Sequence, residues 1–176
     1  LQETVAYDNY QSELTYLTTD TKRLDYMADM IADLGKKGNT LVLIDRIKAG
    51  EGLLERLPED TVFIRGAMKS KDRKQEYDDV SEADNKIIVA TYGVAAVGIN
   101  IPRIFNLVLV EPGKSFVRVI QSIGRGIRKA KDKDSVEIWD LTSSAKFSKK
   151  HLTQRKKFYK EANYPFQVEK VDWEAK

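Results

Sequence analysis

The sequence contains no cysteine and a single histidine, His151. Without thiols, the chain has neither disulfide bonds nor cysteine-ligated metal sites, and it is compatible with a reducing compartment. A single imidazole argues against a histidine-based metal site or a Ser-His-Asp triad. The chain also lacks an apolar run long enough to span a bilayer, and no signal-peptide pattern opens it.

The overall charge carries little information by itself. Thirty Lys and Arg against 27 Asp and Glu give a net charge of +3, and local clusters indicate a nucleic-acid partner better than such a sum does. A length of 176 residues fits one domain with a sizeable core. The first residue is Leu rather than Met, so we expect the chain to have been processed or cut from a longer polypeptide.

Short apolar runs alternate with helical patterns along most of the chain. Continuous rather than alternating apolar residues are typical of strands buried on both faces, and the β-α alternation predicts an α/β domain with a parallel sheet and helices on both faces. The expected strands are 40–44, 61–64, 87–91, 107–110 and 136–141, and the expected helices are 21–34, 49–57, 70–83 and 115–129. We assign residues 20–145 to this domain, 1–19 to a linker or edge strand, and 146–176 to a basic C-terminal extension.

The expected helix at 115–129 has two distinct faces. Apolar residues recur at spacings of three and four, which gives a face that packs on a core: Phe116, Ile120, Ile123 and Ile127. Arg118, Gln121, Arg125 and Arg128 recur on another face. Gly124 and Gly126 each cost about 1 kcal/mol relative to Ala in a helix, which indicates that a ligand approaches the backbone. Guanidinium groups suit phosphate oxygens, although a surface helix with solvated arginines is the simpler interpretation of an isolated pair.

Polar residues and glycines follow the expected strands. In an open parallel sheet, ligands gather at the carboxyl ends of the strands. These positions hold Asp45-Arg46, Arg65-Gly66, Thr91 with Gly98 and Asn100 beyond it, and Glu111 to Ser115. Such groups contact phosphates and sugars through hydroxyls and backbone amides, but turns in α/β proteins also require Gly, Pro and Ser.

The segment Gly113-Lys114-Ser115 is not a phosphate-binding P-loop. That motif requires a further Gly five residues before its Gly-Lys, where this chain has Val108 inside a strand. No other Gly-Lys-Ser/Thr occurs, and no acidic cluster follows a strand to hold Mg²⁺. The chain therefore has cations suited to a triphosphate without a site that binds one alone, which is the pattern of half a two-part active site.

Three segments resemble the motifs of superfamily 2 helicases. Gln121-x-x-Gly124-Arg125-x-x-Arg128 is similar to motif VI, residues 88–102 resemble motif V, and residues 40–45 resemble motif IV. Their order and spacing match the second RecA-like domain of that superfamily over roughly residues 20–145. In detail the chain is similar to the C-terminal half of the phage UvsW-type DNA helicases, which act in recombination, repair and replication-fork processing.

The resemblance implies roles around ATP. Arg128 would be the arginine finger that reaches the γ-phosphate, Arg125 a second phosphate contact, and Gln121 a helper in the same cleft. Gly98 and Asn100 would approach the ribose. ATP and Mg²⁺ would be held mainly by an N-terminal RecA-like domain of the same polypeptide, so we expect this chain alone to hydrolyse ATP negligibly.

The resemblance also implies contacts to a nucleic acid strand. Thr91 would bind a backbone phosphate, and Arg46, Arg65 and Gly66 would lie along the same strand. The partner would be single-stranded or branched DNA, and the location cytoplasmic, in the host if the gene is phage-borne. DEAD-box RNA helicases usually have Arg and Asp where this chain has Val97 and Asn100, and His in place of Gln121. These departures argue for a DNA-directed relative.

Two other functions and two interpretations of the tail remain open at this stage. The chain fits a non-catalytic nucleic-acid-binding module, or a translocase that moves along duplex DNA without unwinding it. The basic tail either follows phosphates, with Phe158 or Tyr159 stacking on a base, or forms a solvated helix whose aromatics pack on the domain. Trp139 and Trp173 are expected to be packing groups.

Overall fold

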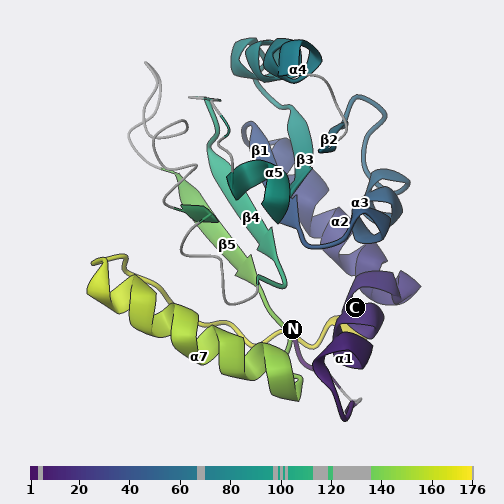
Figure 1. The fold of residues 1–176 in the computed structure, drawn as a ribbon, viewed down its shortest axis with the longest axis vertical. Helices are drawn as coiled ribbons and strands as arrows, with labels where there is room; N and C mark the ends of the chain where they lie inside the picture. The colour runs from purple at the N-terminus through teal and green to yellow at the C-terminus, as the bar shows by residue number, and fades with distance from the viewer. Residues whose placement is uncertain are drawn as a thin grey trace.

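The computed structural model describes residues 1–3, 6–66, 70–96, 99, 101, 103–112, 119–120 and 136–175. Its centre is a five-stranded, all-parallel sheet with strand order β2-β3-β1-β4-β5 (Figure 1). The strands are β1 Thr40–Ile44, β2 Val62–Ile64, β3 Ile87–Thr91, β4 Asn106–Val110 and β5 Glu137–Leu141. All five expected strands are confirmed, with boundaries within one residue.

Helices connect the strands and flank the sheet. They are α1 Tyr10–Thr19, α2 Thr21–Gly35, α3 Ile47–Leu54, α4 Ser70–Glu82, α5 Tyr92–Ala96, α7 Lys146–Glu161 and a short 3₁₀ turn, η1, Trp173–Ala175. Three of the expected helices are thus confirmed at 21–34, 49–57 and 70–83. Of the expected helix at 115–129, the described residues are Val119 and Ile120, which are helical and buried.

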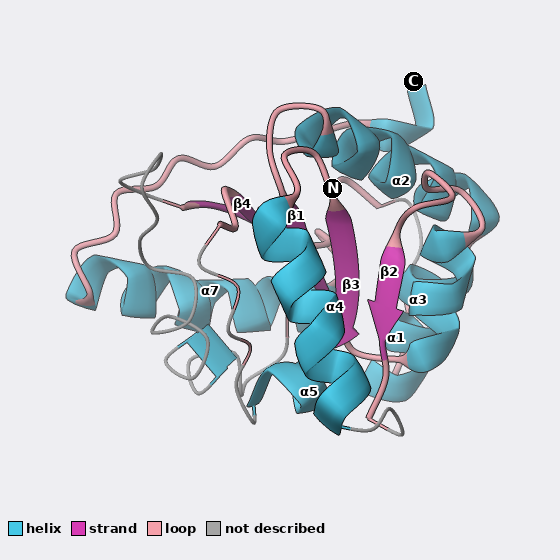
Figure 2. Cartoon of the chain, turned by 90° about the horizontal axis from the view of Figure 1, so that it is seen from above, coloured by secondary structure: helices cyan, strands magenta, loops and turns pink. Residues whose placement is uncertain are grey.

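The helices cover both faces of the sheet, as a parallel sheet requires (Figure 2). On one face α2 and α3 pack against the strands, with Met27, Ile31 and Leu53 fully buried. On the other face the core includes Val80 of α4 and Ala95 of α5. The side chains of β1 and β4 are buried along their whole length, which explains why their sequences are continuously apolar.

The expectation of a linker or edge strand at residues 1–19 is wrong for its second half, because residues 10–19 form α1. Thr and Tyr are common in strands, and their abundance here suggested one. The structure shows helix-forming features instead: the Asn9 side chain accepts a hydrogen bond from Ser12 N at 2.9 Å, and Leu14 and Leu17 are buried on one side of the helix. Tertiary packing against α2 and α3 therefore overrides strand propensity.

Asp20 separates α1 from α2. Its side chain accepts a hydrogen bond from Arg23 N at 2.9 Å, which caps the N-terminus of α2. Its backbone N–H bonds to Tyr16 O and ends α1. One residue thus turns the chain between two consecutive helices.

The C-terminal segment returns to the N-terminal side of the molecule after α7, so that the two ends of the chain lie close together (Figure 1). Gln2 N donates to Val171 O at 2.8 Å. Trp173 is buried and η1 packs on α2. Trp139 is partly buried, with Nε1 donating to Asn106 Oδ1 at 3.2 Å. Both tryptophans are packing groups, as expected.

Candidate nucleotide and nucleic-acid interface

Three of the expected nucleic-acid contacts lie on adjacent strands at one edge of the sheet. Arg46 follows β1, Thr91 ends β3, and Arg65 follows β2. Ile44 of β1 pairs with Thr91, and Ile64 of β2 pairs with Ala90. Because paired strands lie about 4.8 Å apart, these residues form a row along the carboxyl edge, where ligands of parallel sheets bind.

Thr91 is half-buried at the point where β3 becomes α5. Its Oγ1 accepts a hydrogen bond from Val94 N at 3.2 Å, which satisfies one of the free amides of the first helical turn. A hydroxyl that accepts in this way keeps its proton for donation. Thr91 is therefore oriented by the helix and can still donate to a phosphate oxygen.

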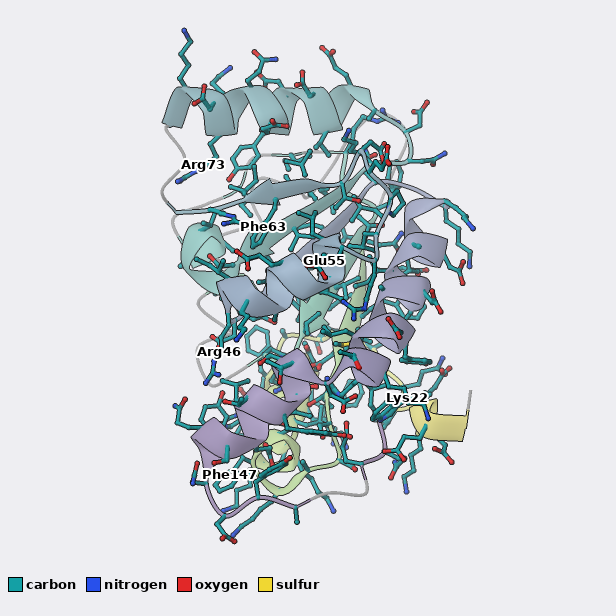
Figure 3. The ribbon with its side chains drawn as sticks, turned by 90° about the vertical axis from the view of Figure 1, so that its right-hand side faces the viewer. Lys22, Arg46, Glu55, Phe63, Arg73 and Phe147 are labelled. Carbon is teal, nitrogen blue, oxygen red and sulfur yellow. The ribbon has the colours of Figure 1, made fainter. Side chains whose placement is uncertain are left out.

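Arg46 is held between α3 and α1 (Figure 3). It is the N-cap residue of α3, and its guanidinium donates to Thr15 Oγ1 at 3.0 Å and to Gln11 Oε1 at 2.7 Å. Both partners are neutral, so they fix the side chain without cancelling its charge. Arg46 forms no ion pair with the residues that the structure describes, and an oriented cation at a strand end is well suited to a phosphate.

Arg65 and Gly66 differ from Arg46 in their accessibility to a ligand and in the interactions that a ligand would have to displace. Arg65 forms an ion pair with Glu51 at 3.2 Å and its guanidinium carbon lies 4.7 Å from the centre of the Phe63 ring, so a phosphate would compete with a carboxylate. Gly66 is exposed, and no described residue comes within 4 Å of the position that a Cβ would take. Its carbonyl oxygen accepts a hydrogen bond from Arg73 Nη2 at 3.3 Å, and the open side of its backbone is accessible to a bound strand.

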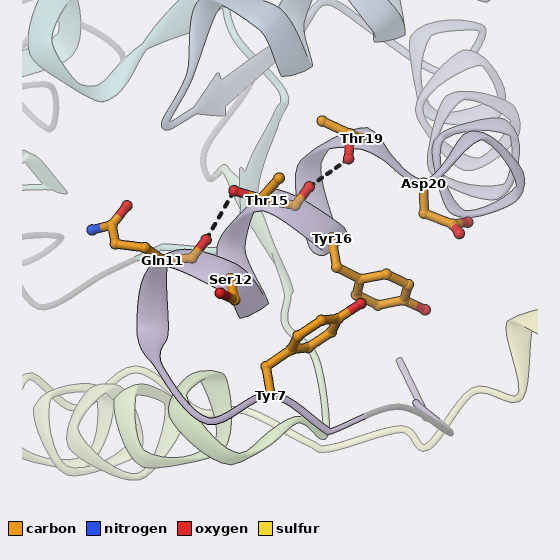
Figure 4. Close-up of a pocket in the computed structure, with 7 residues that line it drawn as sticks. All are labelled: Tyr7, Gln11, Ser12, Thr15, Tyr16, Thr19 and Asp20. Atoms are coloured by element: carbon orange, nitrogen blue, oxygen red, sulfur yellow. Dashed lines mark hydrogen bonds between the residues drawn. The ribbon is translucent and has the colours of Figure 1, made fainter.

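An open hollow of about 560 Å³ lies beside Arg46 on α1 (Figure 4). Gln11 and Thr15, which hold Arg46, form part of its lining, together with the Tyr7 and Tyr16 rings, whose centres are 5.6 Å apart. The rest of the lining is Ser12, Thr19 and Asp20. With hydroxyls, an amide and a carboxylate but no cation, this lining does not suit a triphosphate.

The residues expected to contact ATP lie outside the described residues: Gly98, Asn100, Gln121, Arg125 and Arg128. The two described positions that lead into motif VI are Val119 and Ile120. Both belong to the core cluster beside β1, β3 and β4. The apolar face expected for this helix is thus buried at Ile120, the residue next to Gln121.

A buried charge network that the sequence analysis missed lies behind the carboxyl edge. Arg23 of α2 is fully buried; it donates from Nε to Glu3 at 2.8 Å, from Nη1 to Leu17 O at 2.9 Å, and from Nη2 to Glu111. Glu111 directly follows β4, has a positive φ of 45° and also accepts from Ser143 N at 3.3 Å. The network therefore ties α2 to the ends of β4 and β5.

Burial and charge act in opposite directions within this network. Burial lowers the pKa of Arg23, but the Glu111 and Glu3 carboxylates outweigh it, so that the pKa of the guanidinium is raised. For Glu111 the effects are reversed: burial raises the pKa of its carboxyl group, and the positive charge of Arg23 opposes that rise. The pairing is what makes these charges tolerable in the core. Arg23 and Glu111 are 88 positions apart in the sequence, and no local sequence pattern indicates that they pair.

Helix α7 is fixed across the ends of β4 and β5. Arg155 is buried and binds both carboxylate oxygens of Asp140, at 2.7 and 2.9 Å, and Pro112 O at 2.8 Å. At the start of the helix, Glu13 of α1 accepts from Phe147 N and Ser148 N at 3.0 and 2.9 Å, which caps α7 from another element.

The aromatics of α7 pack on the domain. Tyr159 is 6% exposed and donates to Asp140 Oδ2 at 2.8 Å, and Phe158 is partly buried against the core. The hypothesis that Tyr159 stacks on a base is therefore wrong, because its ring is covered. The alternative, a solvated helix whose aromatics face inward, is confirmed for these residues.

The environment of Tyr159 is expected to make the free energy of unfolding fall as the pH rises in the alkaline range. Burial and the Asp140 carboxylate raise the pKa of Tyr159 above its ordinary value. A tyrosine whose pKa is higher in the folded than in the unfolded state contributes to stability. This contribution is complete at pH values below the unfolded pKa of about 10, and it is lost progressively as the pH rises above that value. We expect Tyr159→Phe to reduce the fall in unfolding free energy between pH 10 and 11 by up to about 1.4 kcal/mol, measured by urea unfolding.

The control for this measurement is Tyr164→Phe, since Tyr164 is exposed. It should retain the pH dependence of the wild-type protein. Identical pH profiles for Tyr159→Phe and the wild type would contradict the role assigned to the Tyr159–Asp140 hydrogen bond.

Among the described residues, no group of three or more His, Asp or Glu side chains is placed to hold a metal ion. None of the described helices has the length and hydrophobicity of a membrane span.

Comparisons with known proteins agree with this architecture. The family model "Helicase conserved C-terminal domain" matches residues 22–130. The ATP-dependent DNA helicase uvsW of Enterobacteria phage T4 is 29% identical over 153 residues, which are 85% of this chain and 30% of that protein. Putative helicase 22 of a Sulfolobus islandicus filamentous virus is 27% identical over 104 residues, or 57% and 18% of the two proteins. The chain thus spans a third or less of these relatives.

Solved structures establish the fold. The crystal structure of T4 UvsW superposes with a TM-score of 0.75 at 24% identity, covering 90% of this chain and 36% of that one. The E. coli DEAD-box protein SrmB superposes with a TM-score of 0.62 at 21% identity, covering 85% and 86%. The matched family model and the parallel RecA-like sheet together show that this chain belongs to the helicase conserved C-terminal domain family, as the C-terminal RecA-like domain of a superfamily 2 helicase.

Proposed function

We propose that this chain is the C-terminal half of an ATP-dependent DNA helicase or translocase that acts on branched DNA in recombination, repair and replication. The row of Thr91, Arg46 and the Arg65-Gly66 loop on three adjacent strand ends carries the proposal. Because the strands that carry them lie about 4.8 Å apart, these phosphate-binding groups can follow the backbone of a bound strand. Contacts to phosphates alone bind with little sequence preference.

ATP would hold two lobes of the enzyme together by contacting both of them. In this proposal the N-terminal RecA-like lobe of the same polypeptide holds most of ATP and its Mg²⁺, and Arg125 and Arg128 reach the phosphates only in the closed state. Gly98 and Asn100 would lie near the ribose, and Gln121 in the same cleft. Because hydrolysis removes contacts present only in the closed state, the cleft opens, and the strand contacts at Thr91 and Arg46 shift with it.

The relationship to a phage DNA helicase supports DNA as the substrate, and it supports the host cytoplasm as the location if the gene is phage-borne. Three positions that differ from the DEAD-box pattern also support DNA rather than RNA as the substrate: Val97, Asn100 and Gln121.

The test is ATP hydrolysis and strand displacement by the complete polypeptide on single-stranded, forked and four-way DNA. We expect DNA to stimulate ATP turnover and branched substrates to be unwound in an ATP-dependent manner. ATP turnover that DNA does not stimulate would contradict the proposal, and DNA binding without any ATP turnover would favour the non-catalytic binding module. Stimulation by duplex DNA without strand displacement would instead identify a duplex translocase.

A further inference from the structure

Helix α7 carries a continuous face of lysines. At about 100° and 1.5 Å per residue, these lysines fall within an arc of about 120° and extend over about 21 Å of the helix. The six residues, called here the lysine face, are Lys146, Lys149, Lys150, Lys156, Lys157 and Lys160. Five of them are exposed and Lys156 is half-buried.

The packing of α7 fixes which way this face points. Ser148, Arg155 and Tyr159 are the buried residues of the helix, and they lie on the opposite side from the lysines. Arg155 and Tyr159 are both bonded to Asp140 of β5, and Glu13 holds the first turn. The helix therefore presents the lysine face to solvent in a fixed orientation, beyond the ends of β4 and β5 (Figure 1).

The positive charge of this face is not compensated within the described part of the chain. None of the six lysines forms an ion pair there, and Glu161, at the end of the helix, is its single acidic residue. Like charges three and four residues apart on a helix repel one another and destabilise it slightly. An anionic partner would remove that repulsion.

The lysine face itself consists of lysines and carries no aromatic side chain. This composition distinguishes between a single-stranded and a double-stranded nucleic acid as its partner. Proteins that bind single strands combine cations with aromatic side chains on which bases stack. On α7, Tyr159 is buried and Phe158 is half-buried against the core. Phe147 is also half-buried: it packs edge-on against Tyr10, with ring centres 6.2 Å apart, and its ring centre lies 5.4 Å from Lys146 Nζ. A row of cations with no fully exposed ring among them suits a partner whose bases are already paired, and whose phosphates form the surface.

We infer that the lysine face of α7 binds the sugar–phosphate backbone of duplex DNA, as a second contact separate from the row at the strand ends. This inference depends on the proposed function for the identity of the ligand. It gives the protein a way to hold the paired arm of a branched substrate while the strand-end residues contact an unpaired one.

The test measures binding of the chain to a fluorescent duplex of roughly 20 base pairs, several times the length of the lysine face. Anisotropy is recorded without ATP, from about 50 to 200 mM NaCl. We expect Lys149→Gln/Lys150→Gln/Lys157→Gln to weaken binding at least about tenfold at the low-salt end, and to reduce the slope of log K against log salt by about 0.9 for each lost phosphate contact.

The matched control is Lys36→Gln/Lys37→Gln/Lys71→Gln, which removes the same charge from exposed lysines outside α7. It should bind as the wild type does. Equal losses in the two variants, or none in the α7 variant, would overturn the inference. So would an equal loss for a single strand of the same length, because the face would then not select duplex DNA.

ATP turnover of the complete polypeptide separates the inference from the proposed function. If the α7 variant binds duplex normally and DNA still stimulates ATP hydrolysis, only the role of α7 is refuted. If DNA stimulates no hydrolysis in the wild type, the proposed function itself fails, whatever the binding data show.

Discussion

Arg128→Ala in the complete enzyme is expected to lower DNA-stimulated ATP turnover by about 10³–10⁵-fold, the range measured for arginine fingers in nucleotide hydrolysis. The guanidinium would stabilise negative charge that develops on the transferred phosphoryl group, and alanine has no group that replaces it. Steady-state ATP hydrolysis at saturating DNA measures the effect. Because the loss concerns the transition state, DNA binding without ATP should be unchanged.

Arg56→Ala is the control for the loss of an arginine. Arg56 lies after α3 and pairs with Asp25, away from the strand ends, and its replacement should leave turnover near the wild-type value. Arg128→Lys should recover little activity, because an ammonium lacks the planar fork of a guanidinium. Wild-type turnover in Arg128→Ala would refute the assignment of the finger.

Arg23→Met is expected to give the largest loss of stability. The substitution leaves the carboxylates of Glu111 and Glu3 buried without the guanidinium that pairs with both, and breaking a buried ion pair in this way costs about 3–5 kcal/mol. Urea unfolding followed by circular dichroism measures the change in the free energy of unfolding. The midpoint should move to lower urea with an unchanged slope.

Two further variants make this prediction specific. Arg23→Met/Glu111→Leu should recover part of the loss, because it removes one of the stranded charges as well. Lys74→Ala, which breaks the exposed Lys74–Asp78 pair of α4, should change stability by less than about 0.5 kcal/mol. If Arg23→Met unfolds at the wild-type midpoint, the network contributes nothing to the fold.

Much of the candidate interface was predictable because it depends on local sequence. Thr91, Arg46 and Arg65 each stand next to an apolar run, and parallel strands place such residues at one edge. Their order along that edge was not predictable. The order β2-β3-β1 makes Thr91 the central member of the row, although it comes last of the three in the chain.

The charged residues show the limit of local reasoning most clearly. Arg23 and Lys22 are adjacent in a polar stretch of α2, yet Arg23 is completely buried and Lys22 is exposed. Similarly, Arg155 and Lys157 belong to the same basic run, yet the first binds Asp140 and the second faces solvent. Helical periodicity separates such residues onto different faces, but the partners that make burial of an arginine possible come from distant segments.

The α/β alternation, the strands, the helicase motifs and the residues that end each strand are all predictable from the sequence alone, since these features depend on hydrophobic periodicity and short-range spacing. The helix at residues 10–19, the pairing of Arg23 with Glu111 and the outward orientation of the lysine face of α7 are apparent only in the folded molecule. These outcomes depend on contacts between segments far apart in the chain, and such contacts exist only after the sheet has brought those segments together.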